Sequence, residues 1–192
     1  MELQHVNVKL LVKKSESLDL ESLIPVLHGW IRDKVFGELL LDVADYRHVH
    51  DGPGVVLIGH QGDYAIDQTD GRLGVRYNRK SAFDGSNRDR LGQATHAALD
   101  ACQRLESEPS LKSALRFDGQ NVELSINDRL LAPNNAATRK GADPEFRNFL
   151  NDLFEGPGYS LSWNEDPRRL LTASVKAARA HSTAELLANL AK

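Results

Sequence analysis

The sequence around Asp70-Gly71 constrains the fold of this 192-residue chain more than any other stretch. Asp-Gly favours a two-residue turn between antiparallel strands, and the residues on both sides of it alternate between apolar and polar. A turn at this place predicts a β-hairpin with one apolar and one polar face. The predicted pairs on the apolar face are Tyr64 with Tyr77 and Ile66 with Val75.

The polar face of this hairpin is predicted to be charge-matched. Its register places Asp67 diagonal to both Arg72 and Arg76. A slip by one residue would move the arginines onto the face of the tyrosines, so the sequence predicts this one register.

Apolar periodicity predicts further elements along the chain. The expected strands are 5–12, 39–43, 55–60, 159–163 and 171–175, and a second hairpin turns at Asp118-Gly119 with Leu115, Phe117, Val122, Leu124 and Ile126 on one face. The expected helices start after Asp19 or Ser22, after Ser86 or Asn87, at Asp143-Pro144, and at the capping box Ser182-x-x-Glu185. Residues 127–142 are expected as a long polar loop, 55–60 as a central strand, and 167–180 as strand, with helix as the alternative.

The second of these helices, from about residue 88 to 106, has an apolar stripe dominated by small residues, which predicts a close approach to a sheet. The stripe is Leu91, Ala94, Thr95, Ala98, Ala101, Cys102 and Leu105.

This order of elements predicts an α+β fold, a mainly antiparallel sheet built from hairpins with about four helices packed on it. The length fits a single compact domain over residues 1–192. The alternative is a division into two lobes near residues 81–87.

Charge and composition narrow the classes of partner and compartment. The 24 basic and 27 acidic residues give a formal net charge of −3, without a basic stripe interleaved with aromatic residues, so we expect no nucleic-acid partner. The chain lacks a run of about 18 apolar residues, so we expect no membrane partner. Its single cysteine, Cys102, cannot form an internal disulfide, which agrees with a reducing compartment and predicts a cytoplasmic protein.

Three histidines lie within a short stretch of sequence and suggest a site for a divalent metal. His48 and His50 project from the same side of an extended segment, and His60 follows the next strand. Three imidazoles with an open position would suit catalytic zinc. The sequence resembles cupins, amidohydrolases and metallo-β-lactamases in the three-residue His-x-His element alone. The alternative is a polar loop whose histidines contact backbone carbonyls or water.

Two polar loops, residues 45–64 and 127–135, are the candidate ligand-binding segments, because long polar loops in compact domains are often functional. Their candidate site residues are Asp45, Tyr46, Asp51, Asp63, Asn127, Asp128 and Arg129.

Three functions follow as hypotheses. The first is a non-catalytic, cytosolic module that self-associates or binds a protein partner, because an exposed edge of an antiparallel sheet favours pairing with another copy. The second is a metal-dependent, hydrolase-like enzyme with His48, His50 and His60 as ligands and Asp45 or Asp63 as base. The third is a small-ligand binder that uses the two polar loops around a concave pocket.

Overall fold

The computed structural model of the chain describes residues 1–15, 18–111 and 115–192, which form one eight-stranded antiparallel sheet and four α-helices. The predicted α+β class is confirmed. Across the sheet the strand order is β2-β3-β4-β5-β1-β6-β8-β7. The strands are β1 (Val6–Ser15), β2 (Leu40–Tyr46), β3 (Gly54–Gly59), β4 (Gly62–Asp67), β5 (Gly74–Arg79), β6 (Leu115–Ile126), β7 (Tyr159–Trp163) and β8 (Leu171–Ala177). The helices are α1 (Leu23–Asp33), α2 (Asn87–Ser107), α3 (Ala136–Leu153) and α4 (Thr183–Leu190).

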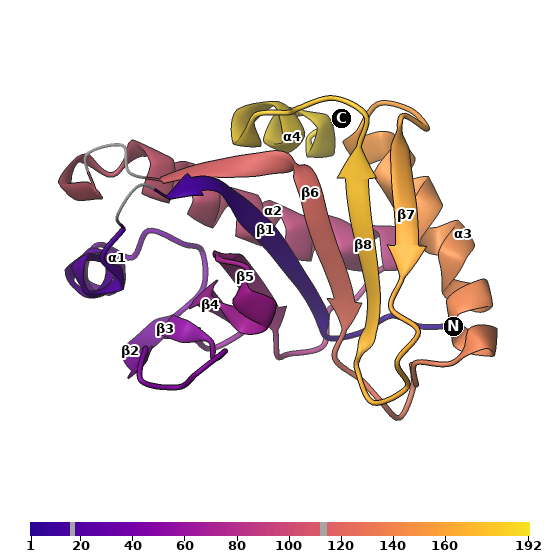
Figure 1. Cartoon of the computed structure of the whole chain (residues 1–192), viewed down its shortest axis with the longest axis horizontal. Coiled ribbons are helices and arrows are strands. Elements are labelled where there is room, and N and C mark those ends of the chain that lie inside the picture. The colour runs from indigo at the N-terminus through magenta and orange to yellow at the C-terminus, as the bar shows by residue number, and fades with distance from the viewer. Residues whose placement is uncertain (16–17, 112–114) are drawn as a thin grey trace.

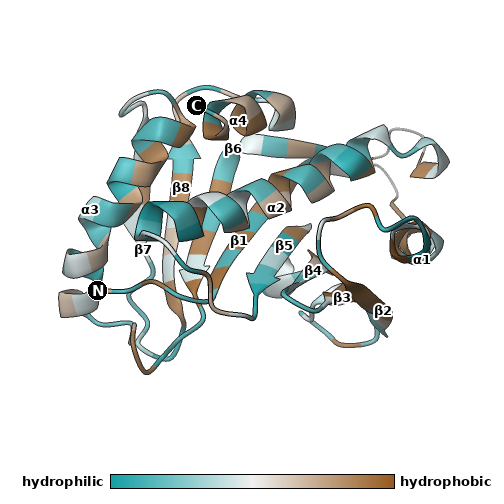
Figure 2. Ribbon diagram, turned by 180° about the vertical axis from the view of Figure 1, so that it is seen from behind, coloured by the Kyte–Doolittle hydropathy of each residue, from teal (hydrophilic) through white to brown (hydrophobic). Residues whose placement is uncertain are grey.

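Helix α2 lies along one face of the sheet, behind the strands in Figure 1 and in front of them in Figure 2. It begins with a reciprocal cap, in which the Ser86 hydroxyl accepts from the Asp89 amide and the Asp89 carboxylate accepts from the Ser86 amide. The predicted small-residue stripe faces the sheet and is buried. Burial, and to a lesser degree the Glu106 carboxylate, raises the pKa of the Cys102 thiol within this stripe.

The side chains of β1 alternate between the two faces of the sheet. Val6, Val8 and Leu10 are buried on the side of α2. Asn7 and Lys9 point to the opposite face, since side chains alternate along a strand. No helix of the described residues covers this second face of β1, β6 and β8 (Figure 1).

The register predicted from Asp70-Gly71 is confirmed, because Tyr64 pairs with Tyr77 and Ile66 with Val75. The connection is a short 3₁₀ turn over Thr69–Gly71 rather than a two-residue turn. The predicted charge match holds for Arg76, which lies 3.1 Å from Asp67, whereas Arg72 pairs with Glu123 of β6.

The predicted hairpin at Asp118-Gly119 is wrong, because β6 runs continuously from Leu115 to Ile126. The register with β1 shifts there: Leu10 pairs with Val122, and Leu11 pairs with Asp118, so the intervening residues form a bulge. A Cβ atom on Gly119 would lie 2.3 Å from the His181 carbonyl oxygen. The glycine therefore allows the backbone at His181 to pack closely against β6 and does not form a turn. The expected apolar face is nevertheless buried.

Two further boundaries differ from expectation. Helix α3 begins after Asn135, whose side chain accepts from the Thr138 amide, so the polar loop ends there and Pro144 lies inside the helix. Asp143-Pro144 resembles a helix start because proline is favoured in a first turn, but the asparagine cap precedes it. Strand β3 lies next to the edge strand β2, not at the centre of the sheet. Residues 171–177 form β8, so the predicted strand is confirmed and the helical alternative is wrong.

Candidate functional site

A cavity of about 330 Å³ lies on the face of the sheet opposite α2. Strands β1, β5, β6 and β8 contribute its floor, and the turn before β5 and the segments before α3 and β8 contribute its rim. The lining residues are Asn7, Thr69, Asp70, Arg72, Arg76, Glu123, Ser125, Arg129, Asn164, Arg169, Leu170, Thr172 and Ser174. Nearly all of them are polar or charged, and the size suits a small metabolite.

The lining carries four arginines against two carboxylates, a formal excess of two positive charges. Both carboxylates are already paired: Asp70 lies 2.9 Å from Arg169, and Glu123 pairs with Arg72. Arg129 instead donates to the carbonyl oxygen of Arg168 at 2.8 Å, and no carboxylate of the described residues pairs with it. The rim is therefore complementary to an anion.

A buried ion triad lies next to this cavity. Lys9 Nζ is 2.5 Å from one carboxylate oxygen of Asp67, and Arg76 is 3.1 Å from the other. The side chains of Lys9 and Asp67 are each only 2% exposed. Desolvation lowers the pKa of Lys9, and the Asp67 carboxylate opposes that change. One carboxylate serves two cations here. Because Arg76 is already counted in the lining, Lys9 and Asp67 leave the excess of two positive charges unchanged.

Asn7 is the least satisfied polar side chain of the lining. It is 7% exposed, and its Oδ1 atom has no hydrogen-bond partner in the described part of the chain. Its neighbours in the adjacent strands are Asn78 and Ser125. A buried polar atom without a partner costs about 1–3 kcal/mol. Asn7 belongs to the cavity lining, but its Oδ1 atom is itself buried and does not face the open cavity.

Hydroxyl groups complete the floor on the side of β8. Ser125 and Thr172 lie opposite each other, with their hydroxyl oxygens 2.9 Å apart. Ser174 lies further along the same strand. These groups both donate and accept, as recognition of ligand hydroxyls requires.

The structure does not bring the three predicted metal-binding histidines together. His48 and His50 follow the end of β2, whereas His60 follows the end of β3. Because Tyr46 pairs with Gly54 and Leu40 pairs with Gly59, the two groups of histidines lie at opposite ends of this strand pair. Across residues 1–15, 18–111 and 115–192, no group of three His, Cys, Asp or Glu side chains could hold a metal ion.

The predicted acidic residues of the first loop have separate roles. Asp45 forms an ion pair with Arg47, and the hydrogen bonds from Arg47 lower the pKa of Asp45 to about 2. Asp63 pairs with Lys80 at 2.7 Å, at the other end of β3. Asp51 accepts a hydrogen bond from the Gly71 amide at 3.0 Å and so supports the turn that forms part of the cavity rim.

The remaining predicted residues divide between the cavity and other surfaces. Tyr46 is exposed beside the first loop. The Asn127 amide donates to the His5 carbonyl, and the Asp128 carboxylate accepts from the Leu131 amide, so both shape the loop. Arg129 is the one member of the predicted set that lines the cavity.

Sequence reasoning missed most of the lining, in particular Asn7 and Arg169. A signal for Asn7 was present, because it alternates with the apolar residues of β1 and therefore lies on the polar face. Arg169 had no such signal, because its position depends on the order of the strands.

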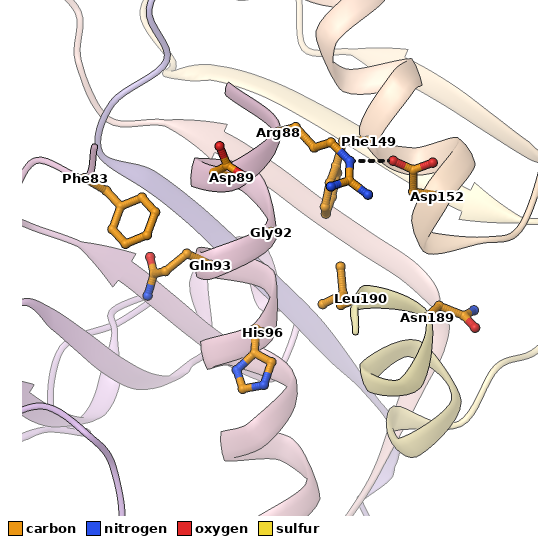
Figure 3. Close-up of a pocket in the computed structure, with 10 residues that line it drawn as sticks. All are labelled: Phe83, Arg88, Asp89, Gly92, Gln93, His96, Phe149, Asp152, Asn189 and Leu190. Atoms are coloured by element: carbon orange, nitrogen blue, oxygen red, sulfur yellow. Dashed lines mark hydrogen bonds and ion pairs between the residues drawn. The ribbon is translucent and has the colours of Figure 1, made fainter. Parts of the chain in front are cut away.

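A second cavity, of about 310 Å³, lies among α2, α3 and α4 on the other side of the sheet. Figure 3 shows Arg88 of α2 directed at Asp152 of α3, and these residues form an ion pair of 2.7 Å. Gln93 donates to the Tyr77 hydroxyl at 3.3 Å, and its Oε1 atom lacks a partner among the described residues. Arg88 is neutralised by Asp152, and the Asp89 carboxylate is used by Ser86 at the start of α2, so this cavity defines no ligand class as the first cavity does.

Two further findings bear on the function of the chain. In the part that the structure describes, no helix has the length and apolar character needed to span a membrane. The chain matches no protein-family model and no curated protein sequence.

Proposed function

We propose that this chain binds a small anionic metabolite that also carries hydroxyl groups, a phosphorylated or carboxylated polyol, in the cavity on the open face of the sheet. The observation that carries the proposal is the arginine-rich rim, where Arg129 pairs with no carboxylate of the described residues. This corresponds to the small-ligand hypothesis, with the 127–135 loop in contact with the ligand and Asp51 of the other loop acting through the turn at Gly71.

The rim of the cavity would bind the anionic group of the ligand, and the floor would bind its hydroxyl groups. Arg129 and Arg169 belong to the rim, and a guanidinium group can hold a phosphate or carboxylate through two parallel hydrogen bonds. Asn7, together with the hydroxyls of Ser125 and Thr172, would pair with the hydroxyl groups of the ligand.

Calorimetric titration with three probes tests the proposal: glucose 6-phosphate, gluconate and uncharged glucose. We expect the anions to bind and glucose not to bind, with affinity that falls as salt is added, because the rim is partly open to solvent and its charges are screened. Failure of both anions, or equal binding of glucose, would refute the assignment of the ligand class.

Replacing Arg129 with glutamine is expected to weaken binding of the anion about tenfold or more, because a hydrogen bond to a charged group contributes about 1.5–3 kcal/mol. The matched control is Arg168→Gln, which removes the same charge from a side chain that is 88% exposed and outside the cavity. Calorimetric titration of both variants measures their affinity for the anion. Equal losses of affinity would indicate a general charge effect instead of a site.

Replacing Asn7 with leucine is expected to lower the affinity for the ligand without lowering the stability of the fold. The variant should lose most of its affinity for the ligand, yet unfold at the same or higher denaturant concentration, because it removes a buried polar group that has no partner in the folded chain. Urea unfolding and calorimetry on the same sample measure both quantities. A stability loss above about 1 kcal/mol would instead assign Asn7 a structural role.

A further inference from the structure

The sheet has two edges, β2 and β7, and they differ in chemistry. Strand β2 is protected by its acidic residues: the Asp42 carboxylate accepts a hydrogen bond from the Val43 amide at 2.8 Å, and Asp45 lies on the same short strand. Two copies of this strand would bring carboxylates together. Side chains of this kind prevent pairing at a sheet edge, although Leu41 is 52% exposed there.

Strand β7 lacks any such protection. Its five residues, Tyr159 to Trp163, carry no charge. The side chains of Ser160 and Ser162 are exposed, and those of Tyr159, Leu161 and Trp163 are only partly buried. Among the described residues, no strand pairs with its outer side.

The hydrogen bonds to β8 show which main-chain groups of β7 point outward. The Asn164 amide donates to the Thr172 carbonyl at 2.9 Å, and the Ala178 amide donates to the Gly158 carbonyl at 2.7 Å. In an antiparallel ladder the hydrogen-bonded positions alternate, so Ser160 and Ser162 also bond to β8. The amide and carbonyl groups of Leu161 therefore face the open edge, as do those of Trp163.

We infer that β7 pairs antiparallel with β7 of a second copy of this chain, with the two-fold axis at Leu161, to form one continuous sheet. The two Leu161 residues exchange amide-to-carbonyl hydrogen bonds, and each Trp163 amide donates to the Tyr159 carbonyl of the other copy. This register places Ser160 opposite Ser162 of the second copy on the open face, and Tyr159 opposite Trp163 on the helix face. The strand is thus self-complementary in hydrogen bonding, in size and in its lack of charge.

This interface contains none of the residues that line the proposed anion site. A shallow groove lined by Arg72, Ser160, Ser162 and Ser174 lies on the open face next to β7, and pairing would join this groove to its copy across the two-fold axis. Ser160 and Ser162 do not line the cavity that contains Arg129, although their groove shares Arg72, Glu123 and Ser174 with that cavity.

The predicted register permits a charge-swap test by sedimentation velocity over a range of concentrations. The wild-type chain, of 21.3 kDa, should form a dimer. The variant Ser160→Glu/Ser162→Glu places like charges opposite each other twice and should weaken the dimer about tenfold or more. The variant Ser160→Glu/Ser162→Lys places opposite charges at the same two positions and should restore it. Leu41→Glu on the other edge is the control and should leave the dimer unchanged.

Three results would overturn the inference: a wild-type chain that stays monomeric at its highest soluble concentration, a dimer unaffected by the double glutamate variant, or no recovery with the glutamate and lysine variant. Circular dichroism establishes that each variant is folded. Anion titration of the Ser160→Glu/Ser162→Lys variant keeps the two proposals separate, since this variant has the net charge of the wild-type chain and should bind the anion unchanged.

Discussion

Replacing Asp67 with alanine is expected to lower the free energy of unfolding by about 3–5 kcal/mol, because it leaves the buried Lys9 ammonium without its counter-charge. The carboxylate also accepts hydrogen bonds from the amide and hydroxyl of Thr69, so the substitution releases the turn at the cavity rim as well. Urea unfolding followed by circular dichroism measures the change.

The control for this substitution is Asp63→Ala on the same strand. In its ion pair with Lys80, the Asp63 side chain is 23% exposed and the Lys80 side chain 41%, compared with 2% for both Lys9 and Asp67. We therefore expect a loss of at most about 1 kcal/mol. The double substitution Lys9→Met/Asp67→Leu should recover most of the stability lost in Asp67→Ala, because it replaces both buried charges by apolar groups of similar size. Equal losses for Asp63→Ala and Asp67→Ala would contradict the role of burial.

Replacing Gly54 with alanine is the second large expected effect. Gly54 has a φ of +66°, and a Cβ atom there would lie 2.2 Å from the Ile66 carbonyl oxygen. Gly71 has nearly the same φ, +64°, but nothing lies within 4 Å of its added Cβ atom. We expect Gly71→Ala to cost about 1–2 kcal/mol for the left-handed backbone. Gly54→Ala should cost about 1–3 kcal/mol more, because the backbone of β4 must move.

The comparison of these two glycines isolates the steric contact, since backbone strain is common to both. Unfolding midpoints of the two variants under identical conditions give the difference. A smaller effect at Gly54 than at Gly71 would show that β3 and β4 can separate without loss of packing.

Features that depend on residues close together in sequence were predictable. The register of β4 with β5 follows from the turn and from the cost of placing arginines on the tyrosine face. The start of α2 follows from the side-chain cap at Ser86. Both are decided by interactions within a few residues or within one hairpin.

The bulge at Gly119 shows where local reasoning fails. Asp-Gly at 118–119 and at 70–71 have the same turn chemistry, but only the second connects two strands. The first lies in a continuous strand because β1 pairs with β6 on both sides of it, over Leu115–Asp118 and over Val122–Ile126. Tertiary pairing therefore decides between a turn and a bulge.

The candidate site could be predicted only in part for the same reason. Arg129, Asn7 and Arg169 come from three distant segments, and the strand order brings them to one cavity. The histidines show the opposite case, because residues near in sequence are separated by the length of β3. Residue types identified candidates, and strand order decided which of them meet.

The lone cysteine of α2 makes every one of these stability comparisons accessible to chemical labelling. Cys102 is fully buried against the sheet and its thiol pKa is raised, so an alkylating reagent reacts with it only when α2 leaves the sheet. The rate of modification under native conditions therefore reports the opening of the core. The natural chain thus carries its own unfolding reporter, without the need to introduce a probe.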